Sequence, residues 1–505
     1  MRLAEVLRGV QHPPLGAAGD REASDVAHDS RRVLPGTVFF ALPGARTDGN
    51  RHAREAVERG AAAVVSELAP PPPPMTLARP GGGGAAWVQV PDAFEAMSRG
   101  ANNFFGDPSA GLSVVGITGT NGKTTTAWFL ESVFSRCGKV PGLVGTIAHR
   151  LRHRVLEKAA NTTPYSLDLL RLLARMREGG ATHVAMEVSS HALSTKRVED
   201  VEFDAAVLTN LQRDHLDFHK THEAYLEAKL RLFELLDRAS SSKRERAAVV
   251  NRDDPAFARF ARAAEGARLV SYGFHEAADL RAEGVVLGRR GTTFRLRRTG
   301  AEAAVTLRLL GRHNVSNALA AAAAAWALGL PEQGVLEGLA ALECVPGRLE
   351  PVEAGQEFAV LVDFAHTAEA LASALETVRA LPHRRIVTVF GCGGDRDPGK
   401  RAPMGEAAAA GSDVVLATSD NPRGEDPLAI LAAVEEGLKR AGRQNYRIVP
   451  DRREAIREAV RLAQPEDLVL IAGKGHEDHQ ILRERTVRFD DREVAREALK
   501  DLGRC

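Results

Sequence analysis

The sequence predicts an α/β protein with largely parallel sheets, and three observations lead to this prediction. Short stretches rich in Val, Ala and Ile alternate with longer stretches rich in Ala, Leu, Arg and Glu along nearly the whole chain. That alternation is typical of parallel strands joined by helices. Several of the short stretches run directly into glycine-containing or polar loops. With 505 residues, the chain exceeds one ordinary hydrophobic core, so several domains are expected.

Composition narrows the class of protein and its partners. Apolar residues make up 44% of the chain and charged residues 26%, which is typical of a globular protein. The formal net charge of +1 gives no support for a nucleic-acid partner. The four cysteines are far apart and form no Cys-x-x-Cys pair, which favours a reducing compartment. Because no signal peptide or membrane-spanning apolar run is visible, we expect a cytoplasmic protein without membrane insertion.

Two composition breaks divide the chain into three predicted domains, residues 1–109, 110–345 and 346–505. The first break is the turn-rich stretch FFGDPSAGLS, and the second is ECVPGRLEPVE. A Pro/Gly-rich insert at 70–84 is interpreted as a loop within the first domain. In the same domain, the predicted strand VFFAL runs into a Pro/Gly turn and a helix that starts near Asn50. Such a turn suits a diphosphate, and a plain strand-to-helix connection explains it equally well.

The middle domain begins with a compact phosphate-binding pattern. The stretch LSVVGITGTNGKTTTAWFLESVF reads as a strand, a glycine-containing turn and a helix. The common loop places two glycines five positions apart before Lys-Ser/Thr, whereas Gly119 and Gly122 are only three apart. Backbone N–H groups and the helix end suit phosphate oxygens, Lys123 suits the β- and γ-phosphates, and the Thr124 hydroxyl suits Mg²⁺. An ordinary glycine turn that caps a helix is the alternative.

Three further side chains in this domain are candidates for chemistry. Glu187 and His215 each follow a predicted strand, where open α/β sheets bind ligands, and they could hold a second Mg²⁺. Alternatively, Glu187 caps a helix and His215 packs against Leu216. Lys229 lies on a helix among apolar neighbours, and its simpler interpretation is a surface lysine with a buried stem.

In the last domain, four polar clusters each follow a predicted strand. They are DFAHTAEAL, GCGGDRDPGKR, SDNPRGEDP and GKGHEDHQ, and we expect them along one sheet edge. The guanidinium of Arg423 offers a fork for a carboxylate. An amino-acid substrate with a second carboxylate at its far end would suit this fork, and a lysine-type substrate would not present one. An ion pair at the surface is the alternative for this arginine.

The motifs GTNGKTT, NTTP, MEVSSHAL and DHLDFH resemble those of the Mur ligase family over essentially the whole chain. That family joins amino acids to bacterial cell-wall precursors with ATP, and the glycine spacing of three is its own form of the loop. The resemblance implies a three-domain α/β architecture. The N-terminal domain would bind a UDP-sugar, the central domain would be a parallel sheet like that of phosphate-loop ATPases, and the C-terminal domain would be Rossmann-like and bind the amino acid.

The resemblance also implies roles for individual residues. Catalytic roles fall to Lys123, Glu187, His215 and Lys229, with Lys229 as N6-carboxylysine and Mg²⁺ held by Thr124, Glu187 and His215. ATP binding falls to Gly119, Thr120, Asn121, Gly122, Lys123, Thr124, Thr125, Asn314 and Arg348. The residues implied to bind the UDP-sugar-peptide are Ser30, Ala45, Arg46, Thr47, Asn161, Thr162, Thr163, Ser189 and Arg197. The residues implied to bind the amino acid are Arg396, Asp420, Asn421, Pro422, Arg423, Gly473 and Glu477.

Among the amino acids that this family adds, meso-diaminopimelate presents a carboxylate at its far end and lysine does not, so Arg423 favours diaminopimelate. The expected activity is ATP-dependent addition of meso-diaminopimelate to UDP-N-acetylmuramoyl-L-alanyl-D-glutamate by a monomer that uses Mg²⁺. The alternatives are the same reaction with L-lysine, a ligase similar to folylpolyglutamate synthase, and a nucleotide-binding regulator without turnover. Two positions depart from the family pattern. Phe364 stands where tyrosine is common, and Thr195 stands where a substrate-contacting glutamine is often found.

Overall fold

The computed structural model describes residues 1–44, 48–70, 84–237, 242–288 and 291–503. The predicted substrate residues 45–47 and most of the Pro/Gly insert lie outside these ranges. The chain forms two compact units, one of residues 1–281 with 317–338 and the other of residues 282–316 with 339–505. The division into three domains at 109 and 345 stays a prediction.

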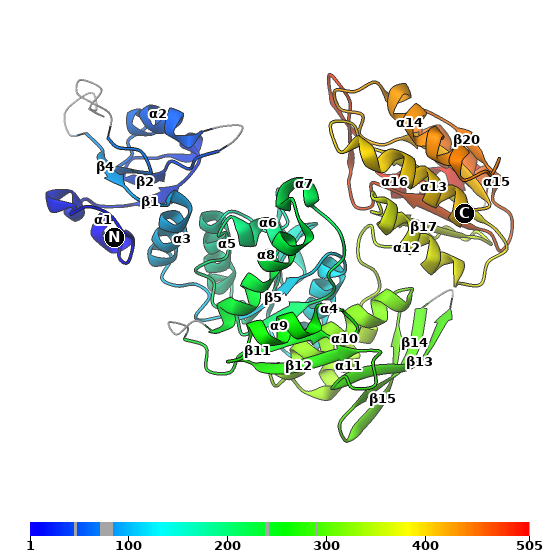
Figure 1. Ribbon diagram of the computed structural model, residues 1–505, viewed down its shortest axis with the longest axis horizontal. Helices are drawn as coiled ribbons and strands as arrows, with labels where there is room; N and C mark the ends of the chain where they lie inside the picture. The colour runs from blue at the N-terminus through cyan, green and yellow to red at the C-terminus, as the bar shows by residue number, and fades with distance from the viewer. Residues whose placement is uncertain (45–47, 71–83, 238–241, 289–290, 504–505) are drawn as a thin grey trace. The chain divides into compact units, whose positions relative to one another are not determined.

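The first unit begins with a small parallel sheet in the order β1-β2-β3-β4 (Figure 1). Its strands are β1 (Asp25–Ala27), β2 (Thr37–Phe40), β3 (Ala63–Ser66) and β4 (Ala86–Gln89). The accompanying helices are α1 (Leu3–Val6), α2 (Ala53–Glu58) and α3 (Ala93–Phe104). Strands β2 and β3 are buried at every position, as expected for strands covered on both faces.

The central sheet of the first unit places the phosphate loop near its middle. Strand β5 (Ser113–Thr118) lies between β10 (Ala205–Leu208) and β9 (His183–Glu187), and all three are parallel. Parallel strands continue outward as β11 (Ala247–Asn251) and β12 (Arg268–Gly273) beyond β10, and as β6 (Pro141–Val144) beyond β9. The antiparallel strands β7 (Ala148–Leu151) and β8 (Arg154–Lys158) complete that side. The carboxyl ends of β5, β9 and β10 therefore meet at one edge.

Helices connect these strands. They are α4 (Lys123–Arg136), α5 (Ser166–Glu178), α6 (Ser190–Ser194), α7 (Leu216–His219), α8 (His222–Glu234), α9 (Phe257–Ala263), α10 (Arg312–Ala327) and α11 (Glu332–Ala341). The alanine-rich helix α10 is buried from Ala318 to Ala325, because side chains this small let its backbone approach its neighbours closely. Strand β13 (Leu280–Gly288) leads into β14 (Gly291–Arg298) and β15 (Ala301–Leu307), which pair as an antiparallel hairpin.

The second unit contains a sheet in the order β16-β17-β21-β18-β19-β20. The strands are β16 (Glu350–Pro351), β17 (Ala359–Asp363), β18 (Ile386–Cys392), β19 (Val414–Ser419), β20 (Tyr446–Ile448) and β21 (Leu468–Ala472), all parallel except β16. One face packs on α12 (Ala368–Arg379), α13 (Arg401–Gly411) and α14 (Pro427–Arg440). The other packs on α15 (Arg452–Leu462) and α16 (Asp491–Asp501). A hairpin of β22 (His479–Ile481) and β23 (Thr486–Arg488) follows β21.

The predicted α/β class with parallel sheets is confirmed. Strands β17, β21, β18 and β19 are adjacent and parallel, and each directly precedes one of the four polar clusters found in the sequence. The clusters therefore gather at one edge, as predicted. Helices cover both faces of this sheet because its strands are apolar on both sides.

Candidate active site

Two glycines of the phosphate loop are required by the backbone. Gly119 has φ +145° and Gly122 has φ +86°, a region that favours glycine. A Cβ on Gly119 would collide with the Thr209 hydroxyl, and a Cβ on Gly122 would collide with the Asn317 side-chain oxygen. Gly122 directly precedes α4, so the first N–H groups of that helix, which lack partners within the helix itself, lie at the loop. This geometry suits a phosphate group.

Gly119→Ala is expected to raise the KM for ATP by at least about tenfold, because the new methyl group displaces the Thr209 hydroxyl from its bond to the Asn121 carbonyl. Initial rates of phosphate release at increasing ATP concentration give the KM for each variant. Gly138→Ala is the matched control, because Gly138 also has positive φ but a Cβ there meets open space. Equal effects of the two substitutions on KM would show that backbone strain, and not the collision, is responsible.

Two lysines donate to the same carbonyl oxygen in this loop. The Lys123 ammonium lies 2.7 Å from the Gly119 carbonyl and 2.9 Å from the Thr120 carbonyl. The Lys229 ammonium lies 2.9 Å from the Gly119 carbonyl. The structure thus brings together two of the predicted catalytic residues from α4 and α8.

Lys229 is not a surface lysine, because it is 1% exposed. Its ammonium lies 4.5 Å from the centre of the Tyr225 ring. Burial, together with the nearby charge of Lys123, lowers the pKa of Lys229 well below its usual value. A neutral amine is the form of lysine that reacts with CO₂, so the position suits the predicted carbamate. Carbamylation itself stays a prediction.

The Glu187 carboxylate is fully buried at the end of β9 and does not cap a helix. One oxygen accepts hydrogen bonds from the hydroxyls of Thr124 and Thr146, each 2.9 Å away, and the other accepts from the Thr146 N–H at 2.8 Å. Carboxylate and hydroxyl oxygens at the phosphate loop are the hard ligands that Mg²⁺ takes. Thr124 and Glu187 therefore fit a magnesium ion.

His215 contacts the rings of two neighbouring residues. Its side chain is 48% exposed, and its ring lies 4.9 Å from His191 and 6.2 Å from Tyr225, centre to centre. Across the described ranges, no three His, Cys, Asp or Glu side chains are grouped closely enough to hold a metal ion. The predicted role of His215 as a metal ligand remains a prediction.

A pocket of about 610 Å³ in the first unit contains the predicted residue Ser30. The Ser30 hydroxyl donates to Glu55 at 2.9 Å, and Tyr165 and Phe94 line the same pocket. Of the predicted UDP-binding residues, Ala45, Arg46 and Thr47 lie outside the described residues. A pocket with an aromatic wall and polar groups beside a helix suits a nucleotide base and diphosphate.

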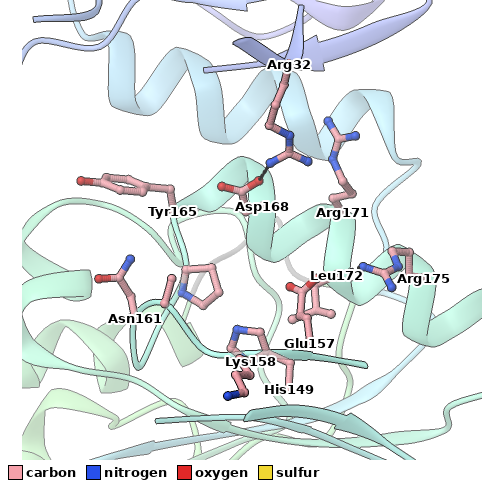
Figure 2. Close-up of a pocket in the computed structure, with 12 residues that line it drawn as sticks. Arg32, His149, Glu157, Lys158, Asn161, Tyr165, Asp168, Arg171, Leu172 and Arg175 are labelled. Carbon is pink, nitrogen blue, oxygen red and sulfur yellow. Dashed lines mark hydrogen bonds and ion pairs between the residues drawn. The ribbon is translucent and has the colours of Figure 1, made fainter. Parts of the chain in front are cut away.

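A second pocket, of about 180 Å³, lies next to this one and also contains Tyr165 (Figure 2). Asn161 lies at its edge, and α5 contributes Asp168 and Arg171. The Arg32 guanidinium donates to Asp168 at 2.8 Å, which ties the N-terminal sheet to α5. Asn161 is exposed to this pocket, as a substrate contact requires.

The other predicted peptide contacts form one network beneath Asn161. The Thr162 hydroxyl lies 3.1 Å from the Thr146 hydroxyl, and the Thr163 hydroxyl donates to the Glu187 carbonyl at 2.9 Å. The Ser189 N–H donates to the Thr163 hydroxyl at 3.1 Å, and Arg197 donates to the Thr163 carbonyl at 3.0 Å. The structure therefore joins this segment to Glu187, between the candidate nucleotide and peptide sites.

In the second unit, Asn314 and Arg348 are the predicted ATP contacts. The Asn314 amide donates to the Leu310 carbonyl at 2.8 Å, while the Arg348 guanidinium lies 5.2 Å from the Phe364 ring centre. That ring also contacts His366 and His476, at 4.6 and 5.0 Å between centres. Phenylalanine in place of the common tyrosine therefore keeps an aromatic platform beneath Arg348.

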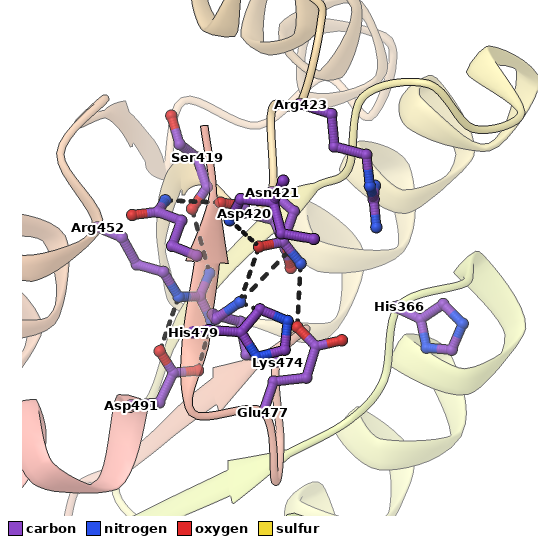
Figure 3. Close-up of polar contacts among 12 residues, drawn as sticks. His366, Ser419, Asp420, Asn421, Arg423, Arg452, Lys474, Glu477, His479 and Asp491 are labelled. Carbon is purple, nitrogen blue, oxygen red and sulfur yellow. Dashed lines mark hydrogen bonds and ion pairs between the residues drawn. The ribbon is translucent and has the colours of Figure 1, made fainter. Parts of the chain in front are cut away.

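Figure 3 shows the polar cluster at the end of β19 and β21. The Asn421 amide donates to Glu477 at 3.0 Å, and the buried Lys474 ammonium contacts both side chains. Gly473 has φ +121°, and a Cβ there would lie 2.7 Å from the Asp420 carboxylate. Behind the cluster, Arg452 and Asp491 form a fully buried, two-point ion pair.

Arg423 has φ +52°, a strained conformation for an arginine. Its N–H donates to the Ile481 carbonyl at 3.1 Å, and its guanidinium donates to the Gly394 carbonyl at 2.8 Å. Its guanidinium contact is thus with a carbonyl, and the remaining N–H groups of the fork suit a carboxylate. Pro422 is buried directly before it, and the predicted residue Arg396 is exposed on the loop after β18.

A phosphate loop at the end of a central parallel strand, with a separate doubly wound sheet that gathers charged loops, defines a phosphate-loop α/β enzyme. Residues 117–325 match the Mur ligase middle domain, residues 347–475 match the Mur ligase glutamate ligase domain, and residues 22–74 match the Mur ligase family catalytic domain.

Individual proteins resemble the chain over nearly all of its length. It is 46% identical over 505 residues to the UDP-N-acetylmuramoyl-L-alanyl-D-glutamate--2,6-diaminopimelate ligase of Solibacter usitatus, covering all of this chain and 99% of that protein. It is 46% identical to the ligase of the same name from Geobacillus kaustophilus, covering 94% of each. A solved structure with this name has 32% identity and a TM-score of 0.71, covering 100% of this chain and 99% of that one. The chain belongs to the Mur ligase family.

Three residues of these sites were missed by reasoning from the sequence. Thr146 contacts Glu187, Tyr165 lines both pockets, and Lys474 lies inside the amino-acid cluster. Thr146 follows a strand in the same way as Glu187, and that position was the available signal. Lys474 lies within the polar motif GKGHE, and nothing in this local pattern indicates that its side chain is buried.

Proposed function

We propose that the protein is an ATP-dependent ligase that joins meso-2,6-diaminopimelate to UDP-N-acetylmuramoyl-L-alanyl-D-glutamate. The observation that carries the proposal is the buried Glu187 carboxylate bonded to Thr124 of the phosphate loop. Together with Lys123, it forms an electrostatic centre for phosphoryl transfer at the end of β5 and β9. The same activity is named in the full-length relatives.

The chemistry follows from the weak electrophilicity of a carboxylate. The substrate carboxylate attacks the γ-phosphorus of ATP, ADP leaves, and an acyl phosphate forms. The amine of diaminopimelate then attacks the acyl carbon and loses a proton, and inorganic phosphate leaves as the amide bond forms. Lys123 stabilises the negative charge that develops during the transfer. When bound, Mg²⁺ would add charge neutralisation on the phosphate oxygens, with Thr124 and Glu187 as its ligands.

The distribution of sites supports the assignment of substrates. Ser30 and its pocket suit the UDP end, the network around Thr163 suits the peptide, and Arg423 suits the distal carboxylate of diaminopimelate. In the described part of the chain, no helix is long and apolar enough to cross a membrane. We further propose that the enzyme works in the cytoplasm as a monomer on small molecules, without nucleic acid, and that its three domains follow the predicted boundaries.

Phosphate release from ATP tests the proposal. The protein is incubated with ATP, Mg²⁺ and the UDP-dipeptide, and candidate amino acids are added one at a time. Release that depends on meso-diaminopimelate, with the tripeptide product seen by mass spectrometry, is the expected result. Release with L-lysine in its place would reassign the amino acid, and release with neither would overturn the ligase assignment.

A further inference from the structure

The side chain of Lys474 places an ammonium group in the interior of the second unit. Its side chain is 0% exposed, and it follows Gly473 at the end of β21. A buried ammonium is costly unless carboxylates and hydrogen-bond acceptors compensate it. Here the partners are the Glu477 carboxylate at 3.0 Å, the Asn421 side-chain oxygen at 3.1 Å and the Asp420 carboxylate at 4.0 Å. All three belong to the predicted amino-acid site (Figure 3).

The two oxygens of Glu477 have different surroundings. Oε2 accepts hydrogen bonds from both Lys474 and Asn421. Neither of these two bonds uses Oε1. This second oxygen of the carboxylate can therefore accept a hydrogen bond from an incoming donor. Although burial raises the pKa of Glu477, the Lys474 charge and the bonds from Lys474 and Asn421 hold that pKa below its ordinary value. The carboxylate is therefore ionised at neutral pH, as binding to an ammonium group requires.

The Asn421 side chain connects several residues of the same cluster. Its Oδ1 accepts from the Ile481 N–H at 2.9 Å and from Lys474, while its Nδ2 donates to Glu477. The amide therefore links the end of β19 to β22 through bonds within the protein. If the Lys474 ammonium is lost, Asn421 keeps its bond from the Ile481 N–H, whereas Glu477 loses one of the two donors to its Oε2.

We infer that Lys474 is a positioning residue, which holds Oε2 of Glu477 so that Oε1 faces the distal ammonium of the incoming amino acid. The inference rests on the proposed function and assigns a role to a residue that does not itself contact the substrate. It predicts that Lys474 acts through Glu477 alone and that its effect is confined to amino acids with a second amine.

The test compares Lys474→Met, Glu477→Gln and the double variant with meso-diaminopimelate and with 2-aminopimelate, which lacks the distal amine. Lys474→Met is expected to raise the KM for diaminopimelate by about tenfold or more, leave the KM for ATP unchanged, and have little effect on 2-aminopimelate. The double variant is expected to match Glu477→Gln, because both substitutions remove one interaction. Lys439→Met, at an exposed lysine paired with Glu435, is the control.

Several outcomes would overturn the inference. Equal losses with the two amino acids would show that Lys474 only supports the fold, and additive effects of the two substitutions would show that it acts independently of Glu477. If Lys474→Met does not fold, the double variant, which removes both charges, carries the comparison with Glu477→Gln. Failure of the proposed function is distinguishable, because then the unaltered protein would release no phosphate with diaminopimelate.

Discussion

Replacing Lys229 with alanine is expected to lower kcat by about 10²- to 10³-fold, the loss typical of removing one preorganised polar group that stabilises a transition state. Lys229 is buried beside Lys123 and shares the Gly119 carbonyl with it. Its pKa is well below the ordinary value because of burial, so an uncharged amine is accessible there. Steady-state assays of phosphate release measure the loss, and Lys139→Ala, at an exposed lysine after α4, is the control.

The chemical form of Lys229 is tested in the same variant. Carbamate formation joins the neutral amine to CO₂ and releases one proton, so the side chain becomes an anion. Partial recovery of Lys229→Ala activity by propionate would support the carbamate, because a short carboxylate replaces the lost anion. Recovery by ethylamine would instead show that the ammonium is the active form. Activity of Lys229→Ala equal to that of the control would contradict any catalytic role.

Arg423→Ala is expected to lower kcat/KM for meso-diaminopimelate by about 10²-fold, because a two-point bond between guanidinium and carboxylate is lost. The bond to the Gly394 carbonyl orients the guanidinium, and the bond from the Arg423 N–H to the Ile481 carbonyl holds the backbone. Turnover with L-lysine, if measurable in the unaltered protein, should change little, because lysine lacks the distal carboxylate. Kinetics with both amino acids measure this selectivity.

Two further variants sharpen that test. Arg423→Lys keeps the charge and loses the fork, so it should recover only a small part of the lost kcat/KM. Arg440→Ala, at an exposed arginine on α14, is the control for loss of a surface charge. Equal losses with diaminopimelate and lysine would end the specificity argument and leave a general effect on the loop.

Local sequence patterns were sufficient for the α/β class and for the phosphate loop. The backbone angles at positions 119 and 122, and the lack of space for a Cβ there, require glycine. Glycines at these two positions in the sequence therefore already indicate the turn. The four polar clusters of the last domain were also placed correctly at one edge, because parallel strands share the direction of their ends.

Contacts that depend on strand order were not visible in the sequence. Thr146 reaches Glu187 only because β6 lies beside β9, although α5 and two further strands separate them along the chain. Lys474 follows β21 and Asn421 follows β19, and only β18 lies between these two strands in the sheet. The two loops therefore come close enough for the side chains to meet. The burial of Lys229 depends on β5 and α8 together, whereas its own helix suggested an exposed side chain.

The Lys123 ammonium lies against two carbonyl oxygens of its own loop. A phosphate that engages this lysine exchanges those partners and does not simply add new ones, so the net gain in nucleotide affinity is modest. During transfer, more negative charge gathers on the moving phosphoryl group, and the exchange becomes more favourable. The loop is therefore suited to rapid turnover more than to tight retention of nucleotide.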